Sequence, residues 1–130
     1  MAVFHSTLNR TKSYVSIRDF YKMVEFYKKI GYKTTDFWDE EDTKGVMFKT
    51  GTKDILEIMY SPDRDPKLVS RPWYVSKQVK DVDALYEYLK RKGFRPTRPK
   101  STPWGDRFIK ISDPIKNVIT YFSLIEPQDH

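Results

Sequence analysis

The residue types that most often carry catalysis are scarce in this chain of 130 residues. Cysteine is absent, and the only two histidines, His5 and His130, lie close to the ends of the sequence. A thiol nucleophile, a disulfide framework and a cysteine-based zinc site are therefore excluded. A histidine-based triad or a multi-histidine metal site is nearly excluded as well, because two histidines near opposite termini cannot supply one.

Aromatic side chains are abundant instead. The chain has 9 Tyr, 8 Phe and 3 Trp, together 15% of its residues. Such a composition argues against disorder and favours a core or a binding surface made of large rings. No apolar run is long enough to span a membrane, and the first 15 residues lack the apolar stretch of a secretory signal. Together with the lack of cysteine, this predicts a cytoplasmic location.

Positive charge is concentrated in the second half of the chain. Residues 13–60 carry 8 basic and 9 acidic side chains, whereas residues 73–124 carry 11 basic and 5 acidic ones. The whole chain has a formal net charge of +6. The excess is explained either by solvated surface lysines and arginines or by a preference for an anionic partner.

The sequence repeats itself at a shift of 62 residues. Residues 17–35 align on residues 79–97 with five identities in 19 positions. The identical pairs are Asp19 and Asp81, Glu25 and Glu87, Lys28 and Lys90, Gly31 and Gly93, and Thr35 and Thr97. In each copy the aspartate is predicted to cap a helix, and the glycine supplies the left-handed residue that ends it.

After each helix the apolar residues alternate, which predicts strands. We expect strands near residues 13–18, 33–38, 45–50 and 54–60, and again near 73–79, 95–100, 106–112 and 117–124. The chain then consists of two βαβββ modules, 13–60 and 73–124, joined by a proline-containing connector at 61–72. Because either module alone buries little core, we expect a single α+β domain spanning residues 1–130.

Short motifs in the second copy carry a family resemblance. They are Pro103-Trp104-Gly105-Asp106-Arg107-Phe108, followed by Asp113-Pro114 and Asn117. With the repeat, they resemble the vicinal oxygen chelate superfamily of glyoxalase I, extradiol dioxygenases, fosfomycin-resistance enzymes and bleomycin-resistance proteins, the last branch being most similar. The resemblance covers residues 12–124 and implies a cupped mixed sheet around a cleft.

The resemblance also implies where a divalent metal would bind. Four side chains on the sheets hold the ion in the metal enzymes of this superfamily, and the repeat places them at Lys12, Glu57, Tyr74 and Thr120. A lysine would have to lose its proton to bind, and Tyr and Thr are poor ligands. We therefore expect no metal and no cofactor, which agrees with the bleomycin-resistance branch, whose members bind and sequester a drug.

Strand alternation predicts which side chains line the implied cleft. They are Trp38, Glu57, Met59, Tyr74, Trp104, Phe108, Thr120 and Phe122. An aromatic lining with a few polar groups suits a planar and sizeable molecule.

Several of these residues have a structural alternative. Glu57 is expected to pair with Lys12, and Trp104 is equally suited to plugging a turn between Pro103 and Gly105. The acidic run at residues 39–42 is either a solvated loop or a site for a cationic group. Trp38, at the end of a strand, is better suited to packing than to recognition, and Tyr74 and Phe122 are equally compatible with packing roles.

The sequence favours a non-catalytic protein that binds or sequesters a small molecule bearing a planar aromatic group, and a glycopeptide antibiotic is one candidate ligand. The alternative is a glyoxalase- or dioxygenase-type enzyme with an atypical metal site, and a nucleic-acid-binding module is the third possibility. Bleomycin is cationic and this chain is basic, so we expect a neutral or anionic aromatic compound to bind more tightly. The resemblance also implies a homodimer, in which an N-terminal arm at residues 1–11 is expected to dock on the partner.

Overall fold

A computed structural model describes residues 9–64 and 73–125. The chain forms two compact units, Met1–Arg71 and Pro72–His130, and each is described by itself. The predicted connector lies mostly outside the described residues, as does most of the predicted N-terminal arm.

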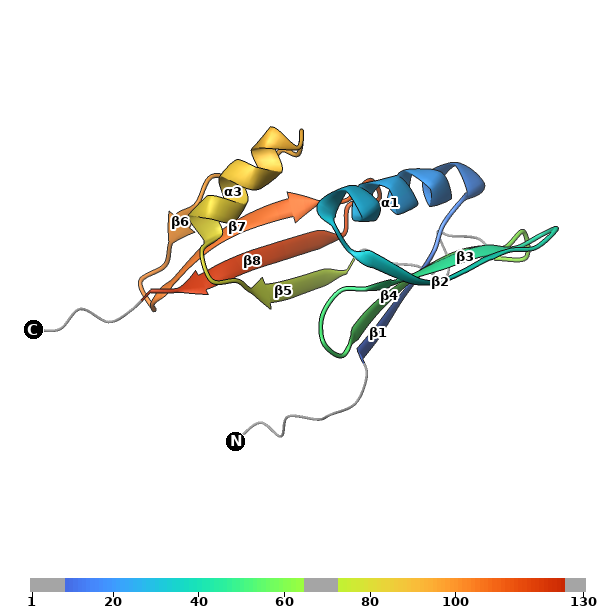
Figure 1. Ribbon diagram of the computed structural model, residues 1–130, viewed down its shortest axis with the longest axis horizontal. Helices are drawn as coiled ribbons and strands as arrows, with labels where there is room; N and C mark the ends of the chain where they lie inside the picture. Colours follow the sequence, from blue (N-terminus) through green and yellow to red (C-terminus); the bar gives the residue numbers. More distant parts are fainter. Residues whose placement is uncertain (1–8, 65–72, 126–130) are drawn as a thin grey trace, which may run out of the picture. The chain divides into compact units, whose positions relative to one another are not determined.

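The first unit is a four-stranded mixed sheet with one helix. It contains β1 (Asn9–Tyr14), α1 (Ile17–Ile30), β2 (Lys33–Asp39), β3 (Lys44–Lys49) and β4 (Asp54–Tyr60). The strand order is β1-β4-β3-β2; β1 runs parallel to β4, and the other pairs are antiparallel. Helix α1 lies across one face of this sheet (Figure 1).

The second unit repeats this arrangement. It contains β5 (Tyr74–Gln78), α3 (Val82–Arg91), β6 (Lys100–Ser101), β7 (Asp106–Ser112) and β8 (Val118–Leu124). The strand order is β5-β8-β7-β6, again with one parallel pair, β5 and β8. The predicted α+β class with two βαβββ modules is confirmed.

The helix ends follow the predicted signals with one exception. Asp81 caps α3 by accepting a hydrogen bond from the Ala84 N–H, and Gly31 ends α1 with φ of 114°. Gly93 also has a positive φ, of 93°. The prediction of Asp19 as the cap of α1 is wrong, because Ser16 is the cap and accepts from the Asp19 N–H.

Two predicted strands are displaced. The first strand is β1 at Asn9–Tyr14 rather than residues 13–18, because the chain turns at Ser16 into the helix. The strand predicted at 95–100 shrinks to the two residues of β6. Pro96 and Pro99 lack the N–H groups that a ladder needs, and between them Thr97 exchanges hydrogen bonds with the backbone of Lys110.

Each helix buries apolar side chains against one face of its own sheet. In the first unit, Phe20, Met23 and Tyr27 of α1 are 0–1% exposed, as are Val46, Phe48 and Ile58 of the sheet. In the second unit, the buried set is Val82, Leu89, Ile109, Ile111, Ile119 and Tyr121. The other face of each sheet is not covered by its own helix and is available for a binding site.

A buried polar turn joins β7 to β8. The Asp113 carboxylate accepts hydrogen bonds from the Ile115 and Asn117 N–H groups and from the Asn117 side-chain amide. The Asn117 amide oxygen accepts from the Trp73 N–H at 2.9 Å. Asn117 is 0% exposed and Asp113 is 5% exposed. The Asp-Pro-x-x-Asn motif is therefore a structural device that fixes β8 beside β5.

An ion pair fastens α3 to its sheet on the outside. The Arg107 guanidinium donates two hydrogen bonds to Asp83, at 2.8 and 3.0 Å. The hydrogen bond from Arg107 lowers the pKa of Asp83, and the reciprocal bond raises the pKa of Arg107.

This pair predicts a pH dependence of stability. A carboxyl pKa that is lower in the folded state contributes stability above the unfolded value, about 3.9, and loses it as the pH falls through the folded value. The protein should therefore be more stable than Arg107→Gln at pH 7, and the gap should close below about pH 4. Chemical unfolding across this range measures the gap, with Lys110→Gln on the opposite face of β7 as the charge control. A gap that does not change with pH would refute the ion-pair account.

No helix within residues 9–64 and 73–125 is long and apolar enough to cross a membrane.

Candidate functional site

The face of the second sheet that points away from α3 carries aromatic and hydroxyl side chains. The strand register places Phe108 opposite Phe122, and Phe122 opposite Gln78. The next row across the same face contains Lys110, Thr120 and Ser76. The rings of Phe108 and Phe122 in one row thus lie beside the polar side chains of the next row.

A cavity of about 420 Å³ lies over these rows. Its lining residues are Ser76, Thr102, Trp104, Asp106, Phe108, Lys110, Thr120 and Phe122. The volume falls in the usual range for small-molecule pockets, about 300–1,000 Å³. We call this cavity the aromatic pocket.

Trp104 stands at the edge of the aromatic pocket with 79% of its surface exposed. The turn that carries it is held at both ends, since the Thr102 hydroxyl donates to the Asp106 carboxylate at 2.9 Å and the Thr102 N–H donates to the Asp106 carbonyl at 2.8 Å. Gly105 follows with φ of 103°, which favours glycine. A fixed turn therefore presents an exposed indole, and the plug role considered for Trp104 does not fit.

The pocket's two charged residues differ in how they are engaged. The Asp106 carboxylate is bonded to Thr102 within the turn. The Lys110 ammonium lies 5.8 Å from the centre of the Phe108 ring, and Lys110 is exposed. The rim of the pocket therefore offers the exposed Lys110 ammonium to a ligand, whereas the Asp106 carboxylate already accepts a hydrogen bond from Thr102.

A second cavity of about 420 Å³ lies in the first unit. It is lined by Tyr14, Trp38, Thr43, Lys44, Met59, Tyr60, Ser61, Asp63 and Arg64. It is more polar, with the Arg64 guanidinium 5.2 Å from the centre of the Tyr14 ring. Lys44 forms an ion pair with Asp39, and that hydrogen bond raises the pKa of Lys44.

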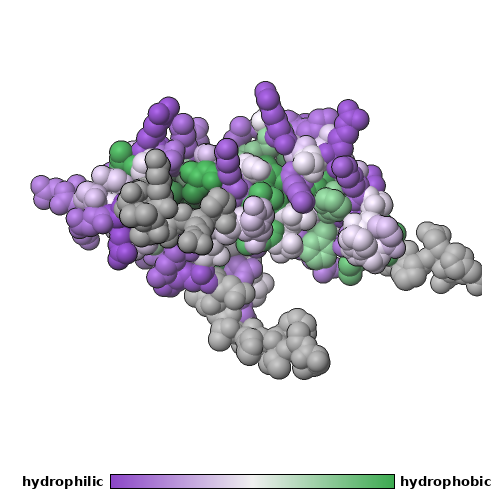
Figure 2. Space-filling model, turned by 180° about the vertical axis from the view of Figure 1, so that it is seen from behind, coloured by the Kyte–Doolittle hydropathy of each residue, from purple (hydrophilic) through white to green (hydrophobic). Residues whose placement is uncertain are grey.

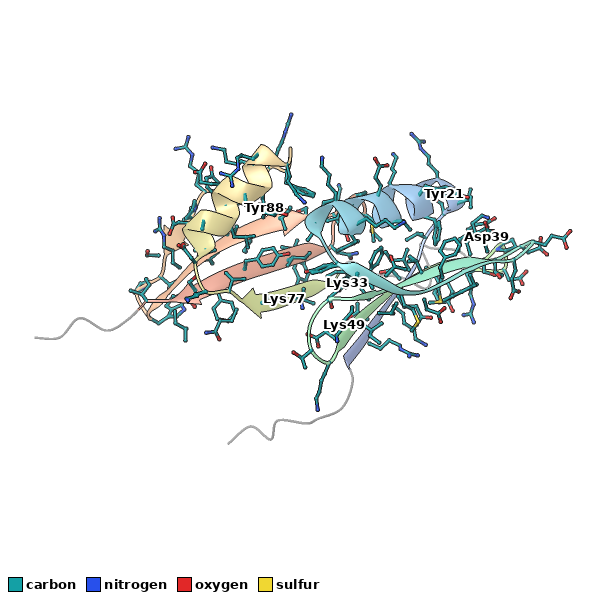
Figure 3. The ribbon with its side chains drawn as sticks, in the orientation of Figure 1. Tyr21, Lys33, Asp39, Lys49, Lys77 and Tyr88 are labelled. Atoms are coloured by element: carbon teal, nitrogen blue, oxygen red, sulfur yellow. The ribbon has the colours of Figure 1, made fainter. Side chains whose placement is uncertain are left out.

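Trp38 lies flat on the backbone of the neighbouring strand. It is opposite Gly45 in the register, and a Cβ atom added at Gly45 would lie 1.9 Å from Trp38 Cζ2. Gly45 has no positive φ, so the glycine provides space for the indole rather than an unusual backbone conformation. Figure 3 marks Asp39, the next residue, at this end of the β2–β3 pair.

Gly45→Ala should displace the Trp38 indole and destabilise the first unit by about 1–3 kcal/mol, because the added methyl group overpacks the contact. Denaturant unfolding and Trp fluorescence would measure both effects. The cost should vanish in a Trp38→Ala background. An equal cost in that background would place the strain in the backbone and contradict this account.

Glu57 is buried at 8% exposure on the face away from α1. Lys12 lies opposite it in the register, as the predicted pairing requires, but the ion pair formed is with Arg10, at 3.9 Å from Nε to Oε1. The Glu57 Oε1 atom is buried and accepts no hydrogen bond from the described residues. The predicted Lys12–Glu57 pair is thus replaced by a long contact to Arg10.

Sequence comparison decides the family. Residues 7–121 match the model of the Glyoxalase/Bleomycin resistance protein/Dioxygenase superfamily. The chain belongs to this superfamily. Among functionally curated proteins, none matches the sequence at a significant level.

Solved structures of the superfamily share the fold. The antibiotic-binding protein TnmS3 from Streptomyces sp. CB03234 is 25% identical with a TM-score of 0.69, and the match covers 95% of this chain and 98% of that one. A glyoxalase/bleomycin resistance protein/dioxygenase from Nocardioides is 21% identical with a TM-score of 0.71, covering 98% and 89%. A bleomycin-binding protein complexed with bleomycin is 20% identical with a TM-score of 0.61, covering 92% and 98%. The last two likenesses show the fold alone.

The predicted lining residues divide between the two units of this superfamily member. Trp104, Phe108, Thr120 and Phe122 line the aromatic pocket, and Trp38 and Met59 line the cavity of the first unit. Glu57 and Tyr74 line neither cavity. Tyr74 is 75% exposed and lies opposite Val118.

Three pocket residues were not predicted, namely Thr102, Asp106 and Lys110. Alternation along β7 puts Asp106 and Lys110 on the same face as Phe108. These two residues could therefore have been predicted together with Phe108. Thr102 belongs to a turn, where alternation gives no guidance.

In the second unit, one of the predicted metal-binding positions is displaced by one row of the sheet. Lys12 lies opposite Glu57, and in the second unit the residue opposite Thr120 is Ser76 rather than Tyr74. The shift of 62 residues that aligns Gly31 with Gly93 becomes 64 at Lys12 and Ser76, because Gly31 lies 19 positions after Lys12 whereas Gly93 lies 17 positions after Ser76. By register, Tyr74 corresponds to Arg10.

The donor set does not fit the divalent metal of the superfamily's enzymes. With Ser76 in place of Tyr74, the positions hold a lysine, a carboxylate and two neutral hydroxyl groups, and Glu57 is already in contact with Arg10. An ammonium ion and neutral hydroxyls are poor ligands for a first-row divalent ion.

Proposed function

We propose that this protein binds and sequesters a small planar aromatic molecule in the aromatic pocket of its second unit, without transforming it. The observation that carries the proposal is the exposed Trp104 indole, held by a fixed turn beside Phe108 and Phe122. Aromatic pairs add about 0.5–1.5 kcal/mol beyond simple burial, so three rings around one cavity favour a flat ligand.

Charge supports a neutral or anionic ligand over a cationic one. Lys110 is exposed at the rim, whereas the Asp106 carboxylate is bonded to Thr102. Screening over about 8–10 Å in physiological salt limits this bias, so shape should dominate the selection. The antibiotic-binding relatives support a binding role, and bleomycin itself is one ligand to test. A homodimer and a cytoplasmic location remain part of this proposal.

The competing function is a glyoxalase- or dioxygenase-type reaction with an atypical metal site. The residue that favours it is the buried Glu57 carboxylate. Equilibrium dialysis against planar aromatic compounds, followed by mass analysis of the recovered compound, separates the two. Binding proteins return the compound unchanged at one equivalent per site. Turnover that depends on an added metal and is lost in Glu57→Ala would establish the enzyme instead.

A further inference from the structure

A row of cations crosses the first sheet on the face turned away from α1. Lys33 of β2 lies directly opposite Lys49 of β3. Across β4 the row continues through Ile55, and it ends at Arg10 of β1. The buried Val46 and Phe48 point toward α1, so alternation turns Lys49 and its partners to the other face. We call Lys33, Lys49 and Arg10 the cationic row.

The cationic row contains no carboxylate that would neutralise its positive charges. Like charges directly opposite each other destabilise an antiparallel pair. Within residues 9–64 and 73–125, neither Lys33 nor Lys49 has a carboxylate at ion-pair distance. Arg10 has only the 3.9 Å contact to Glu57, which lies one row away. The fold therefore keeps an unfavourable pair of lysines in register beside an arginine.

The three side chains are accessible. Lys33 and Lys49 are exposed, and 43% of the Arg10 side chain is exposed. Figure 3 shows Lys33 and Lys49 together at one end of the β2–β3 pair, with Asp39 at the other end. Neighbouring strands are about 4.8 Å apart, so the two flexible lysine side chains can converge on one oxyanion while Arg10 reaches it from β1.

We propose that the cationic row binds the phosphate group of a small molecule, a phosphate monoester. A dianion with three acceptor oxygens matches three cations from three strands, and its binding relieves the repulsion between Lys33 and Lys49. The site lies in the first unit and shares no residue with the aromatic pocket, so it goes beyond the proposed function. Lysine on the edge strand β2 also deters aggregation, and the test separates this role from binding.

The test uses the full chain and glycerol 1-phosphate, a phosphate monoester without an aromatic ring. Amide chemical shifts in a titration should move at Lys33, Lys49 and Arg10 and give a saturable dissociation constant. Lys33→Gln/Lys49→Gln should weaken the binding of glycerol 1-phosphate at least tenfold. Arg18→Gln/Lys22→Gln, which removes the same charge from exposed positions on α1, should change it less than twofold. Trp104→Ala should have no effect, which keeps this test independent of the aromatic pocket.

A third variant separates binding from folding. Lys49→Glu replaces the repulsive pair with an attractive one, so it should raise the melting temperature while abolishing phosphate binding. Equal weakening by the α1 control, or no saturable shift at the row, would overturn the proposal. A single-stranded oligonucleotide that binds through the same lysines more tightly than glycerol 1-phosphate would also overturn it, in favour of a nucleic-acid partner.

Discussion

Replacing Asn117 with alanine is expected to destabilise the protein by about 3 kcal/mol. The change removes the acceptor of the Trp73 N–H and one donor to the Asp113 carboxylate, in a place where Asn117 is fully buried. A buried donor left without a partner costs about 1–3 kcal/mol, and a buried charge costs more. Urea unfolding monitored by circular dichroism measures the loss.

A control lies in the same turn. Lys116 has φ of 72°, where glycine is favoured over other residues. Lys116→Gly should therefore be neutral or slightly stabilising, opposite in sign to Asn117→Ala. If Asn117→Ala cost less than about 1 kcal/mol, the turn would not be the device that holds β8 and β5 together.

Trp104→Ala is expected to weaken the best planar aromatic ligand by about 2 kcal/mol, roughly thirtyfold, with little effect on stability. The indole is 79% exposed and its turn is held by Thr102 and Asp106, so truncation removes a contact to the ligand rather than a part of the core. Titration calorimetry gives the affinity, and thermal unfolding gives the stability.

Tyr74 offers a matched control for this prediction. It is an aromatic residue of the same unit with 75% exposure, and it does not line the aromatic pocket. Tyr74→Ala should leave the affinity within a factor of two. Equal losses for the two variants would mean that the ligand contacts both rings or binds elsewhere.

Exposed apolar surface does not by itself identify the binding site, because apolar side chains are exposed at several places on the molecule (Figure 2).

The sequence predicted the modules because their signals are local. Helical spacing, the capping Asp81 and the left-handed Gly31 and Gly93 each act within a few residues. The predicted element boundaries were wrong where two local signals in the sequence favour different structures. Ser16 caps α1 three residues before the expected Asp19, and two prolines shorten β6.

The site was harder to predict because it depends on register between strands. Trp104, Phe108, Thr120 and Phe122 came from alternation and motif, and they do line one pocket. The cationic row was missed because its members come from three strands, and Lys33 and Lys49 lie within residues 13–60, where 8 basic side chains are outnumbered by 9 acidic ones. A net charge over a segment does not show which side chains the sheet brings together.

The stacking contact of Trp38 on Gly45 was missed for a related reason. Glycine in a strand usually suggests a bulge or a close approach, but only the register shows that an indole fills the space. In the second unit, the corresponding strand carries Phe108 itself. The two modules therefore place rings at equivalent rows from different strands.

The most direct test of ligand binding at the aromatic pocket is an amide chemical-shift titration with neutral and anionic planar aromatics, such as anthraquinone-2-sulfonate, and with bleomycin. The account predicts saturable shifts centred on Phe108, Thr120 and Phe122, with the neutral or anionic compound bound more tightly than bleomycin. Submicromolar binding of bleomycin, with no shifts at these residues for any other planar compound, would contradict it.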